Sequence, residues 1–174
     1  DTSNPDFTTI TQTKILASDP AASDRFGSRL AIYGDYAIVG AYGNDDTPSS
    51  SGSAYIFVRS GTTWTQQAKL LASDAANLDE FGRAVAIYGD YAIVGAYQND
   101  DAGLDSGSAY IFVRSGTTWT QQAKLLASDA AQYDYFGMSV AIYGDNYEFY
   151  AVVGASKNDD ASDDINSGSA YIFV

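Results

Sequence analysis

Carboxylate and amide side chains recur at regular intervals and are the residues best suited to chemistry. The motif Asn-Asp-Asp occurs three times, and each copy follows a Ser-Asp pair in the chain. Oxygen atoms of Asp and Asn are ligands that Ca²⁺ prefers, so these segments are candidate calcium sites. The candidate ligands are Asp19, Asp24, Asn44, Asp45, Asp46, Asp74, Asp79, Asn99, Asp100, Asp101, Asp129, Asp134, Asn158, Asp159 and Asp160.

A second interpretation of these residues stays open. Asp and Asn also cap turns through hydrogen bonds to the nearby backbone, and these segments lack the spaced ligands of a dedicated calcium motif. No motif requires a cofactor. The chain has 22 acidic and 9 basic residues and a net charge of −13. This charge predicts neither nucleic-acid binding nor association with anionic membranes. No apolar run approaches the roughly 20 residues of a membrane helix.

Most catalytic arrangements are excluded by residue type. The chain has neither histidine nor cysteine, which removes Ser-His-Asp and Cys-His catalysis and histidine-bound metals. A glycosidase with two carboxylates is formally allowed. However, Glu80 and Glu148 are its only glutamates, and neither recurs at a fixed interval. Glycine-rich phosphate loops are also missing. The sequence therefore predicts a protein that is not an enzyme.

The elements that carry these side chains belong to an internal repeat. The pair Phe-Gly recurs every 55 residues, at Phe26, Phe81 and Phe136, and residues 51–76 are identical to residues 106–131. In the first copy, β-branched and aromatic runs predict strands over 29–33, 36–41, 53–58 and 63–72. Because the first three runs are almost continuously apolar, the pattern predicts sheets that are covered on both faces. No helix is predicted.

Units of this length with four strands are typical of β-propeller blades. The recurring motifs "FG", "AIYGD", "VGA" and "GSAYIFV" resemble the bacterial FG-GAP repeat over nearly the whole chain. The resemblance implies an all-β, β-propeller-type fold in secreted or surface proteins, often adhesive, without a particular catalysis. Integrin-type relatives carry a DxDxDG calcium loop between the first two strands. Here that link is "YGDY", so calcium is not expected at this place.

The repeat also predicts the domain organisation. Residues 6–19 match residues 61–74 after a shift of 55, including Lys14 and the run from Leu16 to Asp19. We therefore interpret 1–174 as one repeat domain, with a donor strand in 6–19 and repeats over 20–73, 74–128 and 129–174. Three four-stranded antiparallel blades result. The last one lacks its fourth strand, and we expect an N-terminal strand of the same or a neighbouring chain to complete it.

An unpaired strand "SAYIFV" at residues 169–174 would expose backbone donors and acceptors with no charge or proline to protect them. A donated strand would satisfy these groups. Three blades alone make a tight ring. A two-chain ring, a filament and a piece of a larger propeller all stay open. The residues expected to make the contact are Thr8, Thr9, Ile10, Thr11, Lys14, Ile15, Leu16, Tyr171, Ile172, Phe173 and Val174.

Two functions follow from these observations. The first is a non-catalytic structural or adhesive protein, extracellular or at the cell surface, whose partner is a further copy of itself. The alternative is a ligand-binding propeller, a lectin or calcium-dependent adhesin, whose acidic loops bind a glycan or protein. Tyrosines near loops could stack on sugars, although most aromatic residues are expected to pack between blades. The loop candidates are Tyr42, Tyr97, Tyr133 and Tyr135.

Overall fold

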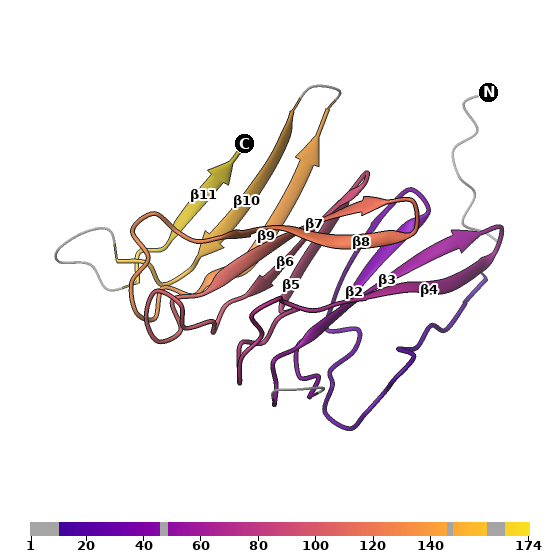
Figure 1. Ribbon diagram of the computed structural model, residues 1–174, viewed down its shortest axis with the longest axis horizontal. Coiled ribbons are helices and arrows are strands. Elements are labelled where there is room, and N and C mark those ends of the chain that lie inside the picture. Colours follow the sequence, from indigo (N-terminus) through magenta and orange to yellow (C-terminus); the bar gives the residue numbers. More distant parts are fainter. Residues whose placement is uncertain (1–10, 46–48, 146–147, 160–165) are drawn as a thin grey trace.

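Three antiparallel sheets make up the fold (Figure 1). The computed structural model describes residues 11–45, 49–145, 148–159 and 166–174, and these residues contain no helix. Two sheets have four strands each, and the third has three. The all-β, propeller-type prediction is thus confirmed, with an incomplete last blade. Within the same described residues, no helix has the length and apolar character needed to cross a membrane.

Each sheet is a meander in which strands pair in chain order. The first sheet consists of β1 (Arg29–Tyr33), β2 (Tyr36–Ala41), β3 (Ser53–Ser60) and β4 (Thr63–Leu70). The second consists of β5 (Ala84–Tyr88), β6 (Tyr91–Ala96), β7 (Ser108–Ser115) and β8 (Thr118–Leu125). The third consists of β9 (Phe136–Gly144), β10 (Phe149–Ala155) and β11 (Ser169–Phe173).

Local sequence explains the turns within a sheet. Tyr33 pairs with Tyr36, so Gly34 and Asp35 form a two-residue hairpin turn between β1 and β2. Gly34 has a φ of +56°, which glycine adopts without steric cost. A bulge in β4 leaves Gln67 without a direct partner, because Ile56 pairs with Ala68 while Phe57 pairs with Gln66. The second sheet repeats the same bulge at Gln122.

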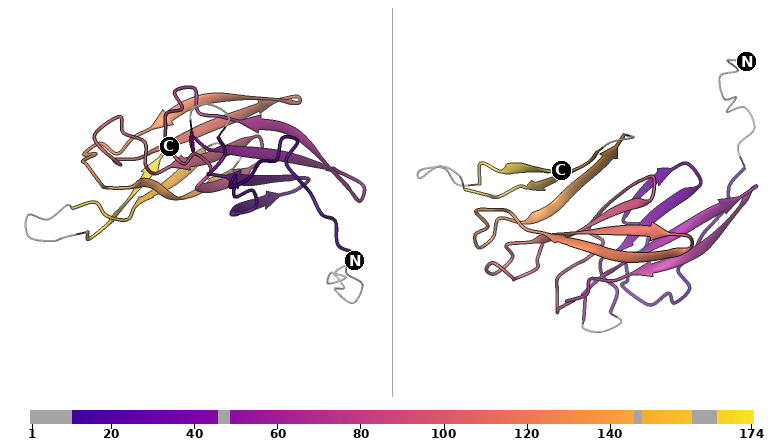
Figure 2. Two further views of the ribbon diagram at one scale, coloured as in Figure 1. Left: turned by 90° about the horizontal axis from the view of Figure 1, so that it is seen from below. Right: turned by 45° about the horizontal axis from the view of Figure 1, so that its top comes forward.

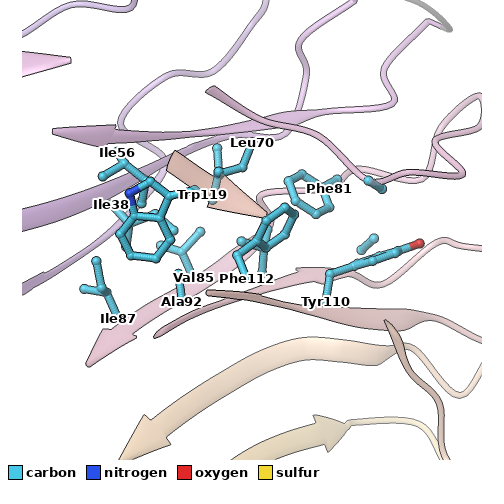
Figure 3. Packing of buried hydrophobic residues seen from close by; sticks show 14 residues of the cluster. Ile38, Ile56, Leu70, Phe81, Val85, Ile87, Ala92, Tyr110, Phe112 and Trp119 are labelled. Atoms are coloured by element: carbon cyan, nitrogen blue, oxygen red, sulfur yellow. The ribbon is translucent and has the colours of Figure 1, made fainter. Parts of the chain in front are cut away.

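The sheets stack face to face in chain order, as expected for blades (Figure 2). Alternating side chains divide each sheet into two faces. We call the face toward the preceding sheet the leading face and the other the trailing face. Between the first two sheets, the trailing residues Ile38 and Ile56 pack with the leading residues Val85, Phe112 and Trp119 (Figure 3). A second core joins the trailing face of the second sheet to the leading face of the third.

The Phe-Gly motif fastens each blade to the preceding one. The Phe81 backbone N–H donates to the Ser51 carbonyl at 2.9 Å. A Cβ on Gly40 would lie 2.1 Å from the Gly82 carbonyl oxygen, so only glycine permits this approach. Phe136–Gly137 repeats the arrangement against Ser106 and Gly95. We call this contact between a Phe-Gly turn and the glycine strand of the preceding blade the FG latch.

The leading segment differs from the prediction in two ways. Residues 11–19 form no strand, and Ile15 and Ala17 instead pack with Val39, Tyr55 and Phe57 on the leading face of the first sheet. This segment lies at the end of the stack opposite β11 (Figure 1). Among the described residues, the leading segment therefore does not complete the last blade of its own chain, because it lies at the other end of the stack. Thr8, Thr9 and Ile10 lie outside those residues.

Candidate assembly faces

Among the described residues, only the leading segment covers the leading face of the first blade, and it leaves β1 exposed. In the second blade, Val85 and Ile87 face the first blade and are only 9% and 6% exposed. Their counterparts one repeat earlier, Leu30 and Ile32, are 71% and 65% exposed. Because the strands have the same registers, the difference comes from the missing neighbour and not from the local fold. The prediction that every sheet is covered on both faces is therefore wrong at this end.

In the part of the chain that the structure describes, no sheet covers the trailing face of the third blade. Ile56 is fully buried between the first and second blades, whereas its counterpart Ile172 is 69% exposed. Val152, the counterpart of the buried Ile38, is also exposed. Exposed aliphatic side chains grouped on one sheet face are typical of an interaction surface. The two ends of the stack thus present the two faces that pack against each other at both internal blade junctions.

β11 also has an open edge. It pairs with β10, from Ala151 opposite Phe173 to Ala155 opposite Ser169, and no strand of the described residues lies along its other edge. In the first two blades the corresponding strands, β3 and β7, each pair with a fourth strand. Among the expected assembly residues, Tyr171, Ile172 and Phe173 lie on this strand, and Val174 follows it.

Two pockets coincide with the missing neighbours. A pocket of about 340 Å³ on the first blade is lined by Ile15, Leu30, Ile32, Val39 and Trp64, among others. A second, also about 340 Å³, is lined by Gln122, Leu125, Phe149, Phe173 and Val174, among others. Gln122 is the counterpart of Gln67, whose Oε1 accepts a hydrogen bond from Trp119 Nε1 at 2.9 Å. The second pocket therefore lies where a fourth strand of the third blade would pass.

The remaining expected assembly residues lie in the leading segment. Thr11, Lys14 and Leu16 are exposed, and Ile15 is half-buried against the first blade. The Ser18 N–H donates to Gln66 Oε1 of the first blade at 2.9 Å, and the Ser73 N–H, just after β4, donates to Gln121 Oε1 of the second blade at the same distance. The leading segment therefore lies against the first blade as β4 lies against the second blade. The leading segment thus has the place of a fourth strand whose own sheet is missing.

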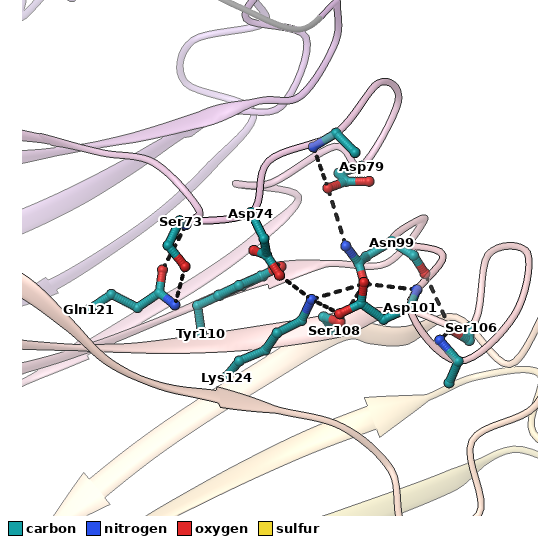
Figure 4. Close-up of polar contacts among 12 residues, drawn as sticks. Ser73, Asp74, Asp79, Asn99, Asp101, Ser106, Ser108, Tyr110, Gln121 and Lys124 are labelled. Atoms are coloured by element: carbon teal, nitrogen blue, oxygen red, sulfur yellow. Dashed lines mark hydrogen bonds and ion pairs between the residues drawn. The ribbon is translucent and has the colours of Figure 1, made fainter.

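Several candidate calcium ligands form ion pairs with lysines. Asp74 accepts hydrogen bonds from the Tyr110 hydroxyl at 2.9 Å and from Lys124 Nζ at 2.5 Å (Figure 4). Lys124 also contacts Asp101 and lies 3.3 Å from Asn99 Oδ1. The first blade repeats the arrangement with Asp19, Tyr55 and Lys69, and in the third Tyr171 donates to Asp129 at 2.7 Å. These carboxylates connect the loop before each blade to its third strand and, in the first two blades, also to its fourth strand.

These contacts shift ionisation equilibria. Burial alone would raise the pKa of Asp74, but hydrogen bonds from Lys124 and Tyr110 and the charge of Lys124 outweigh it, so the pKa is lowered. The pKa of Asp19 is lowered in the same way by Lys69 and Tyr55, again against the effect of burial. Burial dominates at Asp79 and raises its pKa, despite hydrogen bonds from the Ala76 backbone and Asn99.

We expect Asp74 to make stability fall in acid. A carboxylate with a lowered pKa stabilises the fold above its ordinary value of 3.8, and this contribution is lost as the pH falls toward the lower folded value. Asp74→Asn and Lys124→Met should therefore lower the unfolding temperature at pH 7 but reduce its drop between pH 7 and pH 3. Thermal unfolding by circular dichroism measures this. An acid-induced drop equal to that of the parent protein in both variants would contradict the assignment.

A second group of candidate ligands caps the loops behind the FG latch. Asp79 Oδ2 accepts hydrogen bonds from the Ala76 N–H at 2.9 Å and from Asn99 Nδ2 at 3.2 Å. Asn99 Oδ1 in turn accepts one from the Ser108 hydroxyl at 2.7 Å. Asp134 and Asn158 repeat the pair in the third blade, while Asp24 accepts from the Ala21 N–H in the first, where Asn44 accepts from Ser53. Buried Asp and Asn therefore hold the Phe-Gly turn in place.

The other candidate ligands cap loops near the surface. Asp45 accepts from the Ser50 backbone at 2.5 Å, Asp100 accepts from the Asp105 N–H at 2.7 Å, and Asp159 accepts from the Asn166 N–H. Asp46 and Asp160 lie outside the described residues. Among the residues that are described, no group of three or more Asp or Glu side chains is arranged to hold a metal ion. The observed contacts are those of turn capping, and calcium binding stays a prediction.

The loop tyrosines form contacts within the molecule. Arg83 lies over the rings of Tyr42 and Tyr97, at 4.8 and 5.5 Å from their centroids. Tyr97 meets the Tyr135 ring edge-on at 5.2 Å, and burial together with Glu80 raises the pKa of Tyr97 to about 12. Tyr133 is exposed. The rings of Tyr42, Tyr97 and Tyr135 thus contact neighbouring side chains, and sugar stacking on the loop tyrosines stays a prediction.

The sequence analysis did not predict a row of aromatic rings at the hairpin turns that join the first and second strands of each blade. The Tyr33 and Tyr88 ring centroids are 4.4 Å apart, and those of Tyr88 and Tyr143 are 5.2 Å apart. We call this row the tyrosine ladder. It could have been inferred from the repeat, because the three tyrosines have the same place in "AIYGD". The exposure of Leu30 and Ile32 could not have been inferred, because the sequence around them matches that around Val85 and Ile87, which are buried.

Comparison with known proteins agrees with this architecture. A family model described as FG-GAP repeat matches three stretches of the chain, residues 10–57, 64–112 and 119–173. The boundaries of the matches follow the blades: the second and third matches begin within β4 and β8, and the three matches end within β3, β7 and β11. A search of curated proteins finds no match.

Proposed function

The chain belongs to the FG-GAP repeat family, and from this membership we propose that it is a non-catalytic structural module that assembles with copies of itself outside the cell or at its surface. Repeats of this family are typical of extracellular and surface proteins and are generally not catalytic. The lack of histidine and cysteine agrees with a structural role. In this proposal, assembly occurs when the leading segment of one copy becomes the fourth strand of another copy's third blade.

The observation that carries the proposal is the open edge of β11 beside an uncovered sheet face. Unpaired backbone groups on an edge strand are a template for a further strand, and β11 has neither charge nor proline along its length. Ile172 and Val152 add an apolar surface that a donated strand and the blade behind it would cover. A strand added to such an edge gains both backbone hydrogen bonds and apolar burial.

The two complete blades supply the register. In the first blade, Ala54 pairs with Leu70, Tyr55 with Lys69, and Phe57 with Gln66. The second blade has the same pairs one repeat later. Transferred to the third blade, this register sets Ala170 opposite Ile15, Tyr171 opposite Lys14, Ile172 opposite Thr13, and Phe173 opposite Thr11 of the neighbouring copy. Ile10 would lie opposite Val174, and Thr8 and Thr9 would extend the strand beyond it.

The charged contacts support this register. In the first and second blades, a fourth-strand lysine lies beside an Asp–Tyr pair, at 2.6 Å from Asp19 and 2.5 Å from Asp74. Asp129 and Tyr171 form the equivalent pair in the third blade. Lys14 is the residue that the repeat places beside them. Because Lys14 is exposed in the single chain, its side chain is available for this contact.

Removing the leading segment should abolish assembly. We expect the chain lacking residues 1–17 to be monomeric where the parent protein forms larger species, measured by size-exclusion chromatography with light scattering. Deletion of residues 1–5 alone is the matched control, since it leaves the donor residues intact, and it should assemble like the parent. Negative-stain microscopy of the parent distinguishes a ring from a filament.

A second variant tests the same contact without shortening the chain. Lys14→Glu should fold normally because its side chain is exposed, yet it should weaken assembly, since a carboxylate would face Asp129. The loss should be greatest at low salt, where charges are least screened. An unchanged mass distribution for both Lys14→Glu and the chain lacking residues 1–17 would refute strand donation.

A further inference from the structure

We propose that the FG latch also operates between copies: the Phe26–Gly27 turn of one copy docks in the groove formed by Gly154 and Gly168 on the third blade of the next. This inference rests on the proposed self-assembly. It goes beyond strand donation because it specifies which sheet faces meet, in which orientation, and through which residues. The partner is a second copy of this chain, and the contact repeats the two blade junctions already present within the molecule.

The receptor is an open groove on the third blade. A pocket of about 460 Å³ is lined by Ser139, Gly154, Ser156, Ser167, Gly168 and Ala170, among others. At the equivalent positions, a Cβ on Gly40 or Gly95 would lie 2.1 or 2.0 Å from a carbonyl of the following Phe-Gly turn. A Cβ on Gly154 would lie 2.4 Å from the Ser139 hydroxyl oxygen, and the nearest backbone atom would be 3.9 Å away. The groove that is filled at the first two blades is therefore open at the third.

The insert is preformed on the first blade. The Gly27 N–H donates to the Gly40 carbonyl at 3.1 Å, as the Gly82 N–H does to the Gly95 carbonyl. The Phe26 ring meets the Tyr55 ring edge-on at 5.5 Å, the distance found between Phe81 and Tyr110. A Cβ on Gly27 would meet nothing within 4 Å, whereas one on Gly82 would lie 2.3 Å from the Ser53 carbonyl oxygen. The turn thus has its latched shape with its outer side free.

The surfaces around the latch also match. Docking Phe26–Gly27 in this groove brings the exposed Leu30 and Ile32 of one copy over the exposed Val152 and Ile172 of the other. Their buried counterparts make this contact between the first and second blades. It also brings Tyr33 next to Tyr143, so that the tyrosine ladder continues across the junction with the ring spacing it has within the chain.

The contact is head-to-tail, because each copy has one leading and one trailing end and the two differ. Such a heterologous contact leaves a free half on every partial assembly, and it closes into a ring or extends as a filament according to the rotation per copy. When a variant with only one functional end joins an assembly, no further copy should be able to bind to its blocked end. This property separates the proposed junction from a symmetric dimer, in which both copies use the same surface.

The test blocks the groove without disturbing the single chain. In Ser139→Ala/Gly154→Ala, the first substitution removes the hydroxyl that the new methyl group would meet, and it creates the alanine found at the equivalent position, Ala84. The second places a methyl group where the Gly27 carbonyl of the next copy would lie. We expect the parent unfolding temperature at low concentration but only monomers by light scattering. Ser139→Ala alone is the matched control and should assemble like the parent.

Mixing two blocked variants tests the orientation. Ile32→Lys blocks the leading face and leaves the groove intact, so it should also be monomeric. A mixture of Ile32→Lys and Ser139→Ala/Gly154→Ala should give dimers and nothing larger, because the one functional groove meets the one functional turn. Assembly of Ser139→Ala/Gly154→Ala like the parent would overturn the latch. Two folded monomeric variants that fail to dimerise would overturn the head-to-tail orientation, and with it the inference.

These results separate the latch from strand donation. If the chain lacking residues 1–17 is monomeric while the groove variant assembles, donation stands and the latch is refuted. If the groove variant is monomeric while the shortened chain assembles, the latch stands and donation is refuted. A parent protein that is monomeric at every concentration tested would refute both.

Discussion

Replacing Gly95 with alanine is expected to lower the free energy of unfolding by about 4 kcal/mol or more. The new Cβ would lie 2.0 Å from the Gly137 carbonyl oxygen and 2.9 Å from its carbon, far inside van der Waals contact. Both are backbone atoms held by the Phe136 N–H bond to Ser106, so neither can move without opening the junction between the second and third blades. Urea denaturation of the variant and the parent measures the change.

The matched control is Gly154→Ala, which makes the same substitution in the same motif one repeat later. Its Cβ would meet only the hydroxyl of Ser139, which can rotate away, so we expect a loss below about 1 kcal/mol. Both variants should be compared at low protein concentration, because the proposed assembly would stabilise the folded chain by mass action. Equal losses at the two glycines would contradict the FG latch as the basis of blade packing.

Replacing Phe81 with alanine should cost about 3–5 kcal/mol. Its ring is fully buried between the first two blades, in edge-on contact with Tyr110 at 5.5 Å and Phe112 at 6.0 Å. The surrounding backbone is fixed by the latch, so the cavity left by the ring cannot collapse. Urea denaturation reports the loss, and the slope of the transition should stay unchanged if the variant still unfolds in one step.

Phe26→Ala is the control for this prediction. Phe26 occupies the same position in the motif but lies at the open end, where it is half-buried against Tyr55 and Phe57. We expect a smaller loss of about 1–2 kcal/mol in the monomer. A loss at Phe26 as large as that at Phe81 would show that the ring acts within its own blade and that the preceding blade adds nothing.

The strands could be predicted from sequence because their signals are local. Runs of β-branched and aromatic residues predicted β1 and β2 with the observed bounds, and β5 and β6 have the same bounds 55 residues later. The fourth strands end at Leu70 and Leu125, two residues before their predicted ends, because pairing with the third strand stops at Ala54 and Ala109. Such an end depends on the partner strand, which propensity does not describe. The FG-GAP resemblance was confirmed by the family match.

The candidate site was harder to predict because exposure depends on neighbours. Leu30 and Val85 lie in similar apolar runs, yet one is 71% exposed and the other is buried. Nothing in either run indicates whether another blade covers it. The acidic residues illustrate a different limit. Their residue types and motifs placed Asp79 and Asn99 among possible metal ligands. Only the fold reveals that Asp79 accepts hydrogen bonds from Asn99 and from the backbone.

The repetition of identical junctions has a consequence for how such a protein can change its length. Each blade boundary uses the same turn, glycines and registers, so duplicating or deleting one 55-residue unit would leave every remaining boundary chemically unaltered. Both termini of the array would keep their shapes as well. Recombination would then change the size in whole-blade increments while the contacts between blades stay the same. Under the proposed head-to-tail contact, chains with different blade numbers should copolymerise.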